Sequence, residues 1–136
     1  MANSFRALLA ALLLLAARPA WAAPCDWMGG TEQLSIQLLF GRAMPDRQSV
    51  TPDAWASFLA DAVTPRFPDG LTVLDGNGQW QDPAGRLSRE PSTMVLIVTK
   101  PAPDLAARLE AVRQDYRARF HQQSVGLVVT PSCAAF

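Results

Sequence analysis

Two carboxylates, Asp75 and Glu90, are the residues whose type and spacing could carry acid/base chemistry. They lie on two strand-like segments that we expect to form a hairpin with its turn at residues 83–84. In that register Asp75 faces Ser92, and Glu90 faces Asn77. The two carboxylates then become diagonal neighbours, close enough to share a proton or a cation if both face the same way. The structural alternative is that Asp75 caps a bulge and Glu90 pairs with an arginine.

Three further side chains could complete a ligand pocket around this pair. Arg42 could bind a carboxylate ligand through two parallel hydrogen bonds, Trp80 could stack on a ring, and Tyr116 could act as an acid. Each also has a structural interpretation. Arg42 could pair with a neighbouring carboxylate such as Glu90, Trp80 could pack across strands, and Tyr116 lies in an apolar helix stripe. We favour the structural interpretation for all three, as we do for the two carboxylates.

The chain contains a single histidine, His121. This excludes a metal centre built from several histidines, and a Ser/His/Asp triad would rest on this one residue at a helix end. The phosphate-binding, dinucleotide-binding and zinc-protease motifs are missing from the sequence. We therefore expect neither a metal nor a cofactor.

The first residues have the pattern of a signal peptide. Arg6 supplies the positive charge, residues 7–17 are apolar, and residues 20–22 read Ala-Trp-Ala, a cleavage site. We expect cleavage after Ala22, which makes residues 1–22 the signal peptide and residues 23–136 a single exported domain, periplasmic or secreted. A retained membrane anchor and a lipid-anchored Cys25 are the alternatives, but the apolar run is short for a bilayer and Pro24 fits a lipoprotein cleavage site poorly.

Composition limits the possible partners of this domain. Removal of the signal peptide leaves 10 basic and 12 acidic residues, so a nearly neutral surface gives no electrostatic reason to expect binding to nucleic acid or to a membrane. Cys25 and Cys133 are the two cysteines, and in an exported protein they predict a disulfide. Closing so long a loop would contribute roughly 4–5 kcal/mol in the chain-entropy model.

The hydrophobic pattern predicts six elements. Thr51-Pro52-Asp53 has the residues of a helix start, and the apolar positions 105, 109, 112, 116 and 120 form the stripe of a second helix. The stretch from Arg66 to Trp80 contains Asn77-Gly78, which either forms a tight hairpin turn or lies in one long bulged strand; we favour the long strand. The predicted strands cover residues 34–40, 71–82, 94–99 and 125–130.

The resulting order is strand, helix, strand, strand, helix, strand (βαββαβ). This is the ferredoxin-like split βαβ pattern of the α+β class, with a four-stranded antiparallel sheet and both helices on one face. The first and last strands would be antiparallel neighbours, which places Cys25 beside Cys133. The open sheet face would carry Leu39, Val95, Ile97 and Val128. An exposed apolar face usually marks a partner surface, so we expect a homodimer formed through it.

Four stretches resemble domain-of-unknown-function family 3574, a family of small, mostly exported bacterial proteins. They are LLFGR at residues 38–42, TPRFPDGLTVLDGNGQW at residues 64–80, Arg89-Glu90 before MVLIV, and YRARFHQQSV at residues 116–125. The resemblance covers nearly the whole mature chain, and its most specific parts are FPDGLTV and GQW. This family has no activity that could be carried over to the chain.

Two functional hypotheses follow from the sequence. The first is a non-enzymatic periplasmic or secreted binding module that dimerises through its sheet. The alternative is a small metal-independent enzyme or small-ligand binder of the dimeric α+β barrel type. In that alternative an acid/base pocket surrounds Asp75 and Glu90 and includes Arg42, Trp80 and Tyr116.

Overall fold

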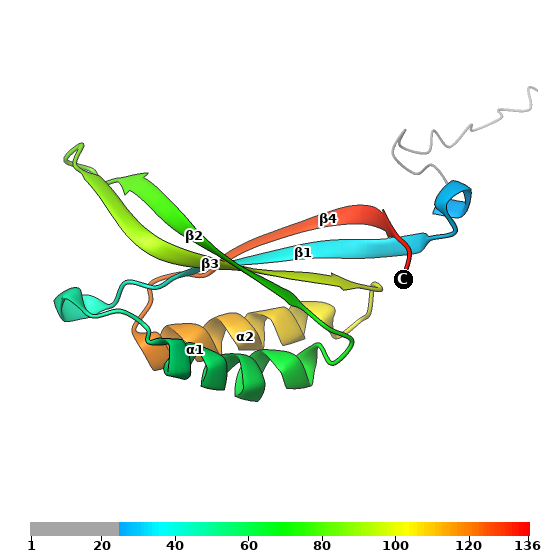
Figure 1. Cartoon of the computed structure of the whole chain (residues 1–136), viewed down its shortest axis with the longest axis horizontal. Coiled ribbons are helices and arrows are strands. Elements are labelled where there is room, and N and C mark those ends of the chain that lie inside the picture. The colour runs from blue at the N-terminus through cyan, green and yellow to red at the C-terminus, as the bar shows by residue number, and fades with distance from the viewer. Residues whose placement is uncertain (1–24) are drawn as a thin grey trace, which may run out of the picture.

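The computed structural model describes residues 25–136, apart from the side chain of Asp46. Four antiparallel strands form one sheet in the order β2-β3-β1-β4, and helices α1 and α2 lie under one face of it (Figure 1). The strands are β1 (Thr31–Gly41), β2 (Thr72–Gln81), β3 (Leu87–Thr99) and β4 (Gly126–Ala134), and the helices are α1 (Pro52–Phe58) and α2 (Leu105–Phe120). The α+β class and the two-helix, four-strand composition are confirmed. The predicted signal peptide lies outside the described residues.

Helix α1 begins where its sequence predicts. The Thr51 side chain accepts a hydrogen bond from the backbone N–H of Ala54 at 3.2 Å, and Pro52 occupies the first turn, where it removes no needed donor. The helix continues through a π-helical turn, Leu59–Val63, and a 3-10 turn, Thr64–Arg66. It therefore covers more of the sheet than its regular α-helical part.

Helix α2 packs its predicted apolar stripe into the core. All five stripe residues are buried: Leu105, Leu109, Val112, Tyr116 and Phe120. The helix ends at Phe120, and the next residue, His121, has a left-handed φ of 54°. This conformation usually falls to glycine at a helix C-terminus, and it turns the chain back toward the sheet.

The core is centred on Phe40 of β1. Its ring makes edge contacts with Trp55 and Phe58 from the α1 side and with Tyr116 from α2, at centroid separations of 5.2, 5.7 and 4.6 Å. Edge-to-face aromatic pairs contribute about 1 kcal/mol each beyond their buried area. These contacts fix both helices against the end of β1, where the candidate residues cluster.

Strand β3 faces the helices with different residues from those that the sequence analysis proposed. Val95 lies opposite Leu38 and Ile97 lies opposite Ile36, and all four are buried on the helix side. Directly opposed residues share a face, so placing Val95 and Ile97 on the open face was wrong. Leu96 takes that position instead, with Met94 and Val98. The run Met94–Val98 is apolar throughout and does not alternate, so it gives no information about which residues face inward.

The β2–β3 hairpin turns through three residues, Pro83, Ala84 and Gly85. The N–H of Gly85 donates to the carbonyl of Asp82 at 2.9 Å, and Gly85 has a φ of +81°. A type I turn followed by a left-handed glycine adds one residue before pairing resumes. Strand β2 is long and paired at every residue from Thr72 to Gln81, so the bulge and the Asn77-Gly78 turn are both wrong.

The extra residue changes which face each carboxylate occupies. Asp75 lies opposite Thr93, and Glu90 lies opposite Gly78. A shift of one residue moves a side chain to the other face of the sheet. Asp75 is therefore on the helix face and Glu90 on the open face, so the predicted diagonal pair is wrong.

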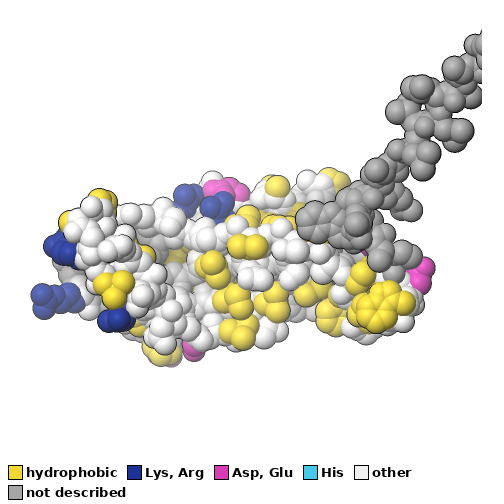
Figure 2. Space-filling view, turned by 90° about the horizontal axis from the view of Figure 1, so that it is seen from above, with side chains coloured by type: hydrophobic (Ala, Val, Ile, Leu, Met, Phe, Trp, Pro, Cys, Tyr) yellow, Lys and Arg dark blue, Asp and Glu magenta, His cyan; other side chains and the backbone are white. Residues whose placement is uncertain are grey.

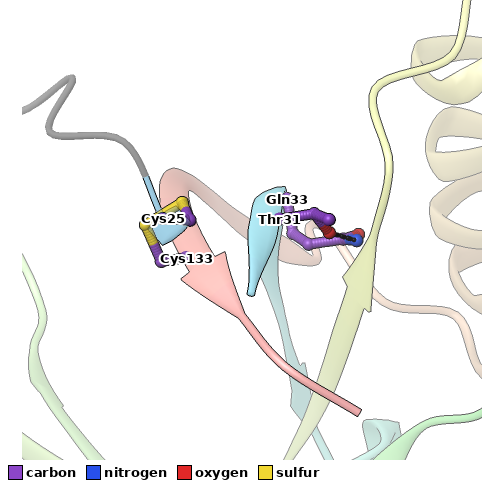
Figure 3. Close-up of a disulfide and its surroundings, with 4 residues drawn as sticks. All are labelled: Cys25, Thr31, Gln33 and Cys133. Carbon is purple, nitrogen blue, oxygen red and sulfur yellow. Dashed lines mark hydrogen bonds between the residues drawn. A yellow bond between two sulfur atoms is a disulfide. The ribbon is translucent and has the colours of Figure 1, made fainter. Parts of the chain in front are cut away.

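The disulfide between Cys25 and Cys133 is present, with the two Cα atoms 5.4 Å apart (Figure 3). It joins the short turn before β1 to the end of β4. Strands β1 and β4 are antiparallel neighbours, with Thr31 opposite Ala134, which brings the two cysteines together as predicted. Among residues 25–136, no helix is long and apolar enough to cross a membrane.

Candidate functional site

The five candidate residues occupy three different places. Glu90 and Trp80 share a cavity on the open face of the sheet. Arg42 and Asp75 line a smaller cavity of about 260 Å³ on the helix side of the β2–β3 hairpin. Tyr116 is fully buried in the core. The single pocket of the alternative hypothesis, lined by all five residues, does not form.

We call the first of these the Glu90 cavity. It has a volume of about 660 Å³ and opens at the end of the sheet where β1 ends and β4 begins. Most of its walls come from the open face and from the segment after α2. Its lining comprises Leu39, Phe40, Gly41, Ala43, Pro45, Gly78, Trp80, Glu90, Ser92, His121, Gln122, Gln123, Ser124 and Gly126.

Glycines create much of this hollow. Gly41, Gly78 and Gly126 stand on three different strands and add no side chain to the open face. Gly78 lies directly opposite Glu90, and Trp80 is the next residue of β2 on that face. Glu90 and Trp80 are thus diagonal neighbours.

The carboxylate of Glu90 is half-buried and has no ion pair or hydrogen-bond donor among the side chains that the structure describes. By contrast, Glu110 binds Arg113 at 2.6 Å and Arg117 at 3.0 Å. Removing a carboxylate from water costs free energy unless a partner compensates it. Glu90 is therefore the best-placed group in the cavity to bind a donor from a ligand.

Gln122 is a cavity residue that the sequence analysis missed. Its amide nitrogen donates to the carbonyls of Ala43 at 2.5 Å and Phe120 at 3.2 Å. The left-handed His121 places it there by reversing the chain after α2. The sequence alone does not distinguish Gln122 from Gln123, which has the same side chain.

The second cluster, which we call the Arg42 cluster, consists of Arg42, Thr93 and Asp75. The Arg42 guanidinium donates to Thr93 Oγ1 at 3.0 Å and to the carbonyl of Val50 at 2.8 Å, and it lies 5.0 Å from the ring centre of Trp55. The Thr93 hydroxyl in turn donates to Asp75 at 3.0 Å. Arg42 therefore reaches Asp75 through Thr93, and within the described residues it forms no ion pair with Glu90.

Tyr116 connects the core to the end of β1 through its hydroxyl, which donates to the carbonyl of Gly41 at 2.7 Å. Burial raises the pKa of Tyr116 to about 12, the nearby Arg42 opposes this rise, and the Glu90 carboxylate adds to it. A phenol with so high a pKa stays protonated at neutral pH and donates to its partner. Its place is structural.

A second cavity of about 660 Å³ lies near the opposite end of the sheet. It is lined by Asp69, Lys100 and the fully exposed Phe136, together with residues of β2 and β3 such as Leu96. None of the five candidate residues lines it. Among the described residues, no group of three or more His, Cys, Asp or Glu side chains is placed to hold a metal ion.

The sequence of residues 35–136 matches the family model described as a protein of unknown function, DUF3574. The chain belongs to this family. The match includes the whole Glu90 cavity and the whole Arg42 cluster, so both lie within the family domain. A comparison with curated proteins gives no match.

Solved structures resemble the fold. A phage SAM lyase in complex with S-methyl-5'-thioadenosine aligns with a TM-score of 0.58 and 16% identity, covering 76% of this chain and 90% of that chain. The phage SAM lyase in its apo state aligns with a TM-score of 0.55 and 17% identity, covering 74% and 86%. At this level of identity the similarity is one of fold.

Proposed function

We propose that this domain is a binding module that holds a small organic molecule in the Glu90 cavity. The observation that carries the proposal is the Glu90 carboxylate, half-buried beside Trp80 and without a partner among the described side chains. Cavities of about 300–1,000 Å³ with an aromatic wall and a few convergent polar groups are typical of small-molecule sites. The Glu90 cavity, at about 660 Å³, fits that description.

The fold comparison supports a small-molecule site on this architecture. The phage SAM lyase of similar fold was solved with S-methyl-5'-thioadenosine, a small molecule with an aromatic ring system. A shared fold does not imply a shared reaction, and we do not extend the lyase activity to this chain. The acid/base alternative required Asp75 and Glu90 on one face, and their separation removes it from the proposal.

We further propose that the module is exported and forms a homodimer through the open face. The disulfide supports an oxidising compartment. Hydrophobic side chains run along the middle of the open face, whereas charged ones lie toward its margins (Figure 2). Leu74 and Val128, outside the lining of the Glu90 cavity, are each more than two-fifths exposed there. An uncharged apolar centre suits pairing of the same patch on two copies. We also propose that the strand order β2-β3-β1-β4 makes the fold ferredoxin-like.

Edge strand β4 offers a matched test of the dimer. Val128 lies opposite Gln37 on the open face and Val129 lies opposite Ile36 on the other face, with exposed fractions of 45% and 44%. We expect Val128→Glu to give a monomer in analytical ultracentrifugation and Val129→Glu to sediment as the wild-type dimer. A monomeric wild type at high concentration, or equal effects of both variants, would contradict this interface.

Ligand binding is tested by native mass spectrometry of protein purified under mild conditions, followed by a small-molecule screen monitored by amide NMR shifts. The proposal expects shifts at Gly41, Gly78 and Gly126, and it expects Trp80→Ala to abolish them. Trp27→Ala is the control, because Trp27 is 80% exposed in the turn before β1, outside the cavity lining. Shifts that persist in Trp80→Ala would place the site elsewhere.

A further inference from the structure

The amide of Gln122 is held in one orientation by its two backbone partners. Only its nitrogen can donate, and that nitrogen donates to the carbonyls of Ala43 and Phe120. The amide oxygen is thereby left on the side facing Gly41. It lies 3.3 Å from the position that a Cβ on Gly41 would take.

Glu90 directs an oxygen to the same place. Its Oε1 lies 3.1 Å from that Cβ position on Gly41. Two acceptor oxygens from different elements, one of them charged, thus converge over a residue that has no side chain. No donor among the described side chains reaches either oxygen.

A donor-rich cation satisfies both oxygens at once. A primary ammonium group carries three N–H donors and no acceptor, and its charge complements the carboxylate. Beside it, Trp80 and Leu39 provide an apolar wall, and a cation near an indole face is attracted by the ring. A trimethylated ammonium keeps the charge but has no N–H to donate, and an alcohol has neither the charge nor three donors.

Building on the proposed small-molecule site, we infer that the Glu90 cavity binds a small organic primary amine. Its ammonium group donates to Glu90 and Gln122 over Gly41, and its apolar part lies against Trp80. This names the chemical class of the ligand and assigns Gln122 as a binding residue. Gly41 contributes by leaving room for the ammonium group.

The test compares three probes of similar shape by calorimetry and NMR: phenethylamine, its trimethylammonium analogue and phenylethanol. We expect phenethylamine to bind at least about 10-fold more tightly than either analogue, as the loss of a charge-assisted hydrogen bond requires. Glu90→Gln should abolish this preference. Gly41→Ala should weaken amine binding by placing a methyl group between the two oxygens. Glu32→Gln, at an exposed position near the start of β1, is the control and should leave amine binding unchanged.

The outcomes separate the inference from the proposed function. Equal binding of the amine and either analogue, or an amine preference that survives Glu90→Gln and Gly41→Ala, overturns the amine inference and leaves a small-molecule cavity in place. If no probe shifts the cavity amides and the screen finds no ligand there, the proposed function fails as well. Gly41→Ala retains the carboxylate, so it tests the site even if Glu90→Gln does not fold.

Discussion

The Glu90 cavity and the Arg42 cluster occupy opposite faces of the same hairpin and differ in the hydrogen bonds that their charged groups make. On the helix face, Arg42, Thr93 and Asp75 form a chain of hydrogen bonds, with Arg42 also bound to the carbonyl of Val50. On the open face, Glu90 has no such partner among the described side chains. We interpret the first set of polar groups as maintaining the fold, and we propose that the second is available to a ligand.

The largest expected effect comes from breaking the Arg42 cluster at its centre. Thr93 is 1% exposed and its hydroxyl both accepts from Arg42 and donates to Asp75. Thr93→Val keeps the shape but removes both bonds, so we expect the free energy of unfolding in urea to fall by about 2 kcal/mol. Ser92→Ala, one residue away on the open face, is the control and should change it by less than about 0.5 kcal/mol. Equal stabilities for the two variants would show that the cluster is not structural.

A smaller loss of stability should follow from straining the β2–β3 turn, which keeps Asp75 and Glu90 on opposite faces of the sheet. At Gly85, with its φ of +81°, an alanine would adopt an unfavourable left-handed conformation. We expect Gly85→Ala to lower the free energy of unfolding by about 1 kcal/mol. Gly76→Ala in β2 meets only Ser92 Oγ at 3.4 Å and should be nearly neutral. If Gly85→Ala leaves the free energy of unfolding unchanged, that would argue against this turn and against the β2–β3 register that it sets.

Tyr116 reports on both regions, because Arg42 lowers its pKa and Glu90 raises it. It is the only tyrosine in the chain, so tyrosinate absorbance follows it alone. We expect a pKa of about 12, against 10.0 for an exposed tyrosine, and a lower pKa in Glu90→Gln. The neutral phenol's contribution to stability is complete below pH 10 and is lost as pH rises toward 12, because the unfolded chain releases its proton first. The Tyr116→Phe variant should not lose this stability as the pH rises from 10 to 12. A pKa near 10 would contradict the buried placement.

The sequence predicted the elements better than it predicted their faces. Helix α2 was readable because five apolar residues recur at helical spacing, and the disulfide followed from two cysteines in a chain with an export pattern. The faces depended on two features without a periodic signal. The run Met94–Val98 is apolar throughout, so its sequence does not show which residues face the helices. The left-handed Gly85 adds one residue to the turn.

The candidate site was only partly predictable for the same reason. Glu90 and Trp80 were identified by residue type, and the structure brings them together. Asp75 was expected to be a diagonal neighbour of Glu90, and a register error of one residue made them appear to share a face. Gln122 could not be identified, because its orientation depends on the carbonyls of Ala43 and Phe120.

The urea unfolding of Glu90→Gln, measured beside the wild type, tests most directly the claim that Glu90 is kept for a ligand. The amide preserves the shape of the side chain, removes its charge and replaces one acceptor oxygen with an NH2 donor. If Glu90 has no structural partner, the free energy of unfolding should stay within about 0.5 kcal/mol of the wild type or rise, because an uncompensated half-buried charge is removed. A loss of about 1.5 kcal/mol or more would mean that Glu90 stabilises the fold through a partner, and the contrast between the two faces would fail.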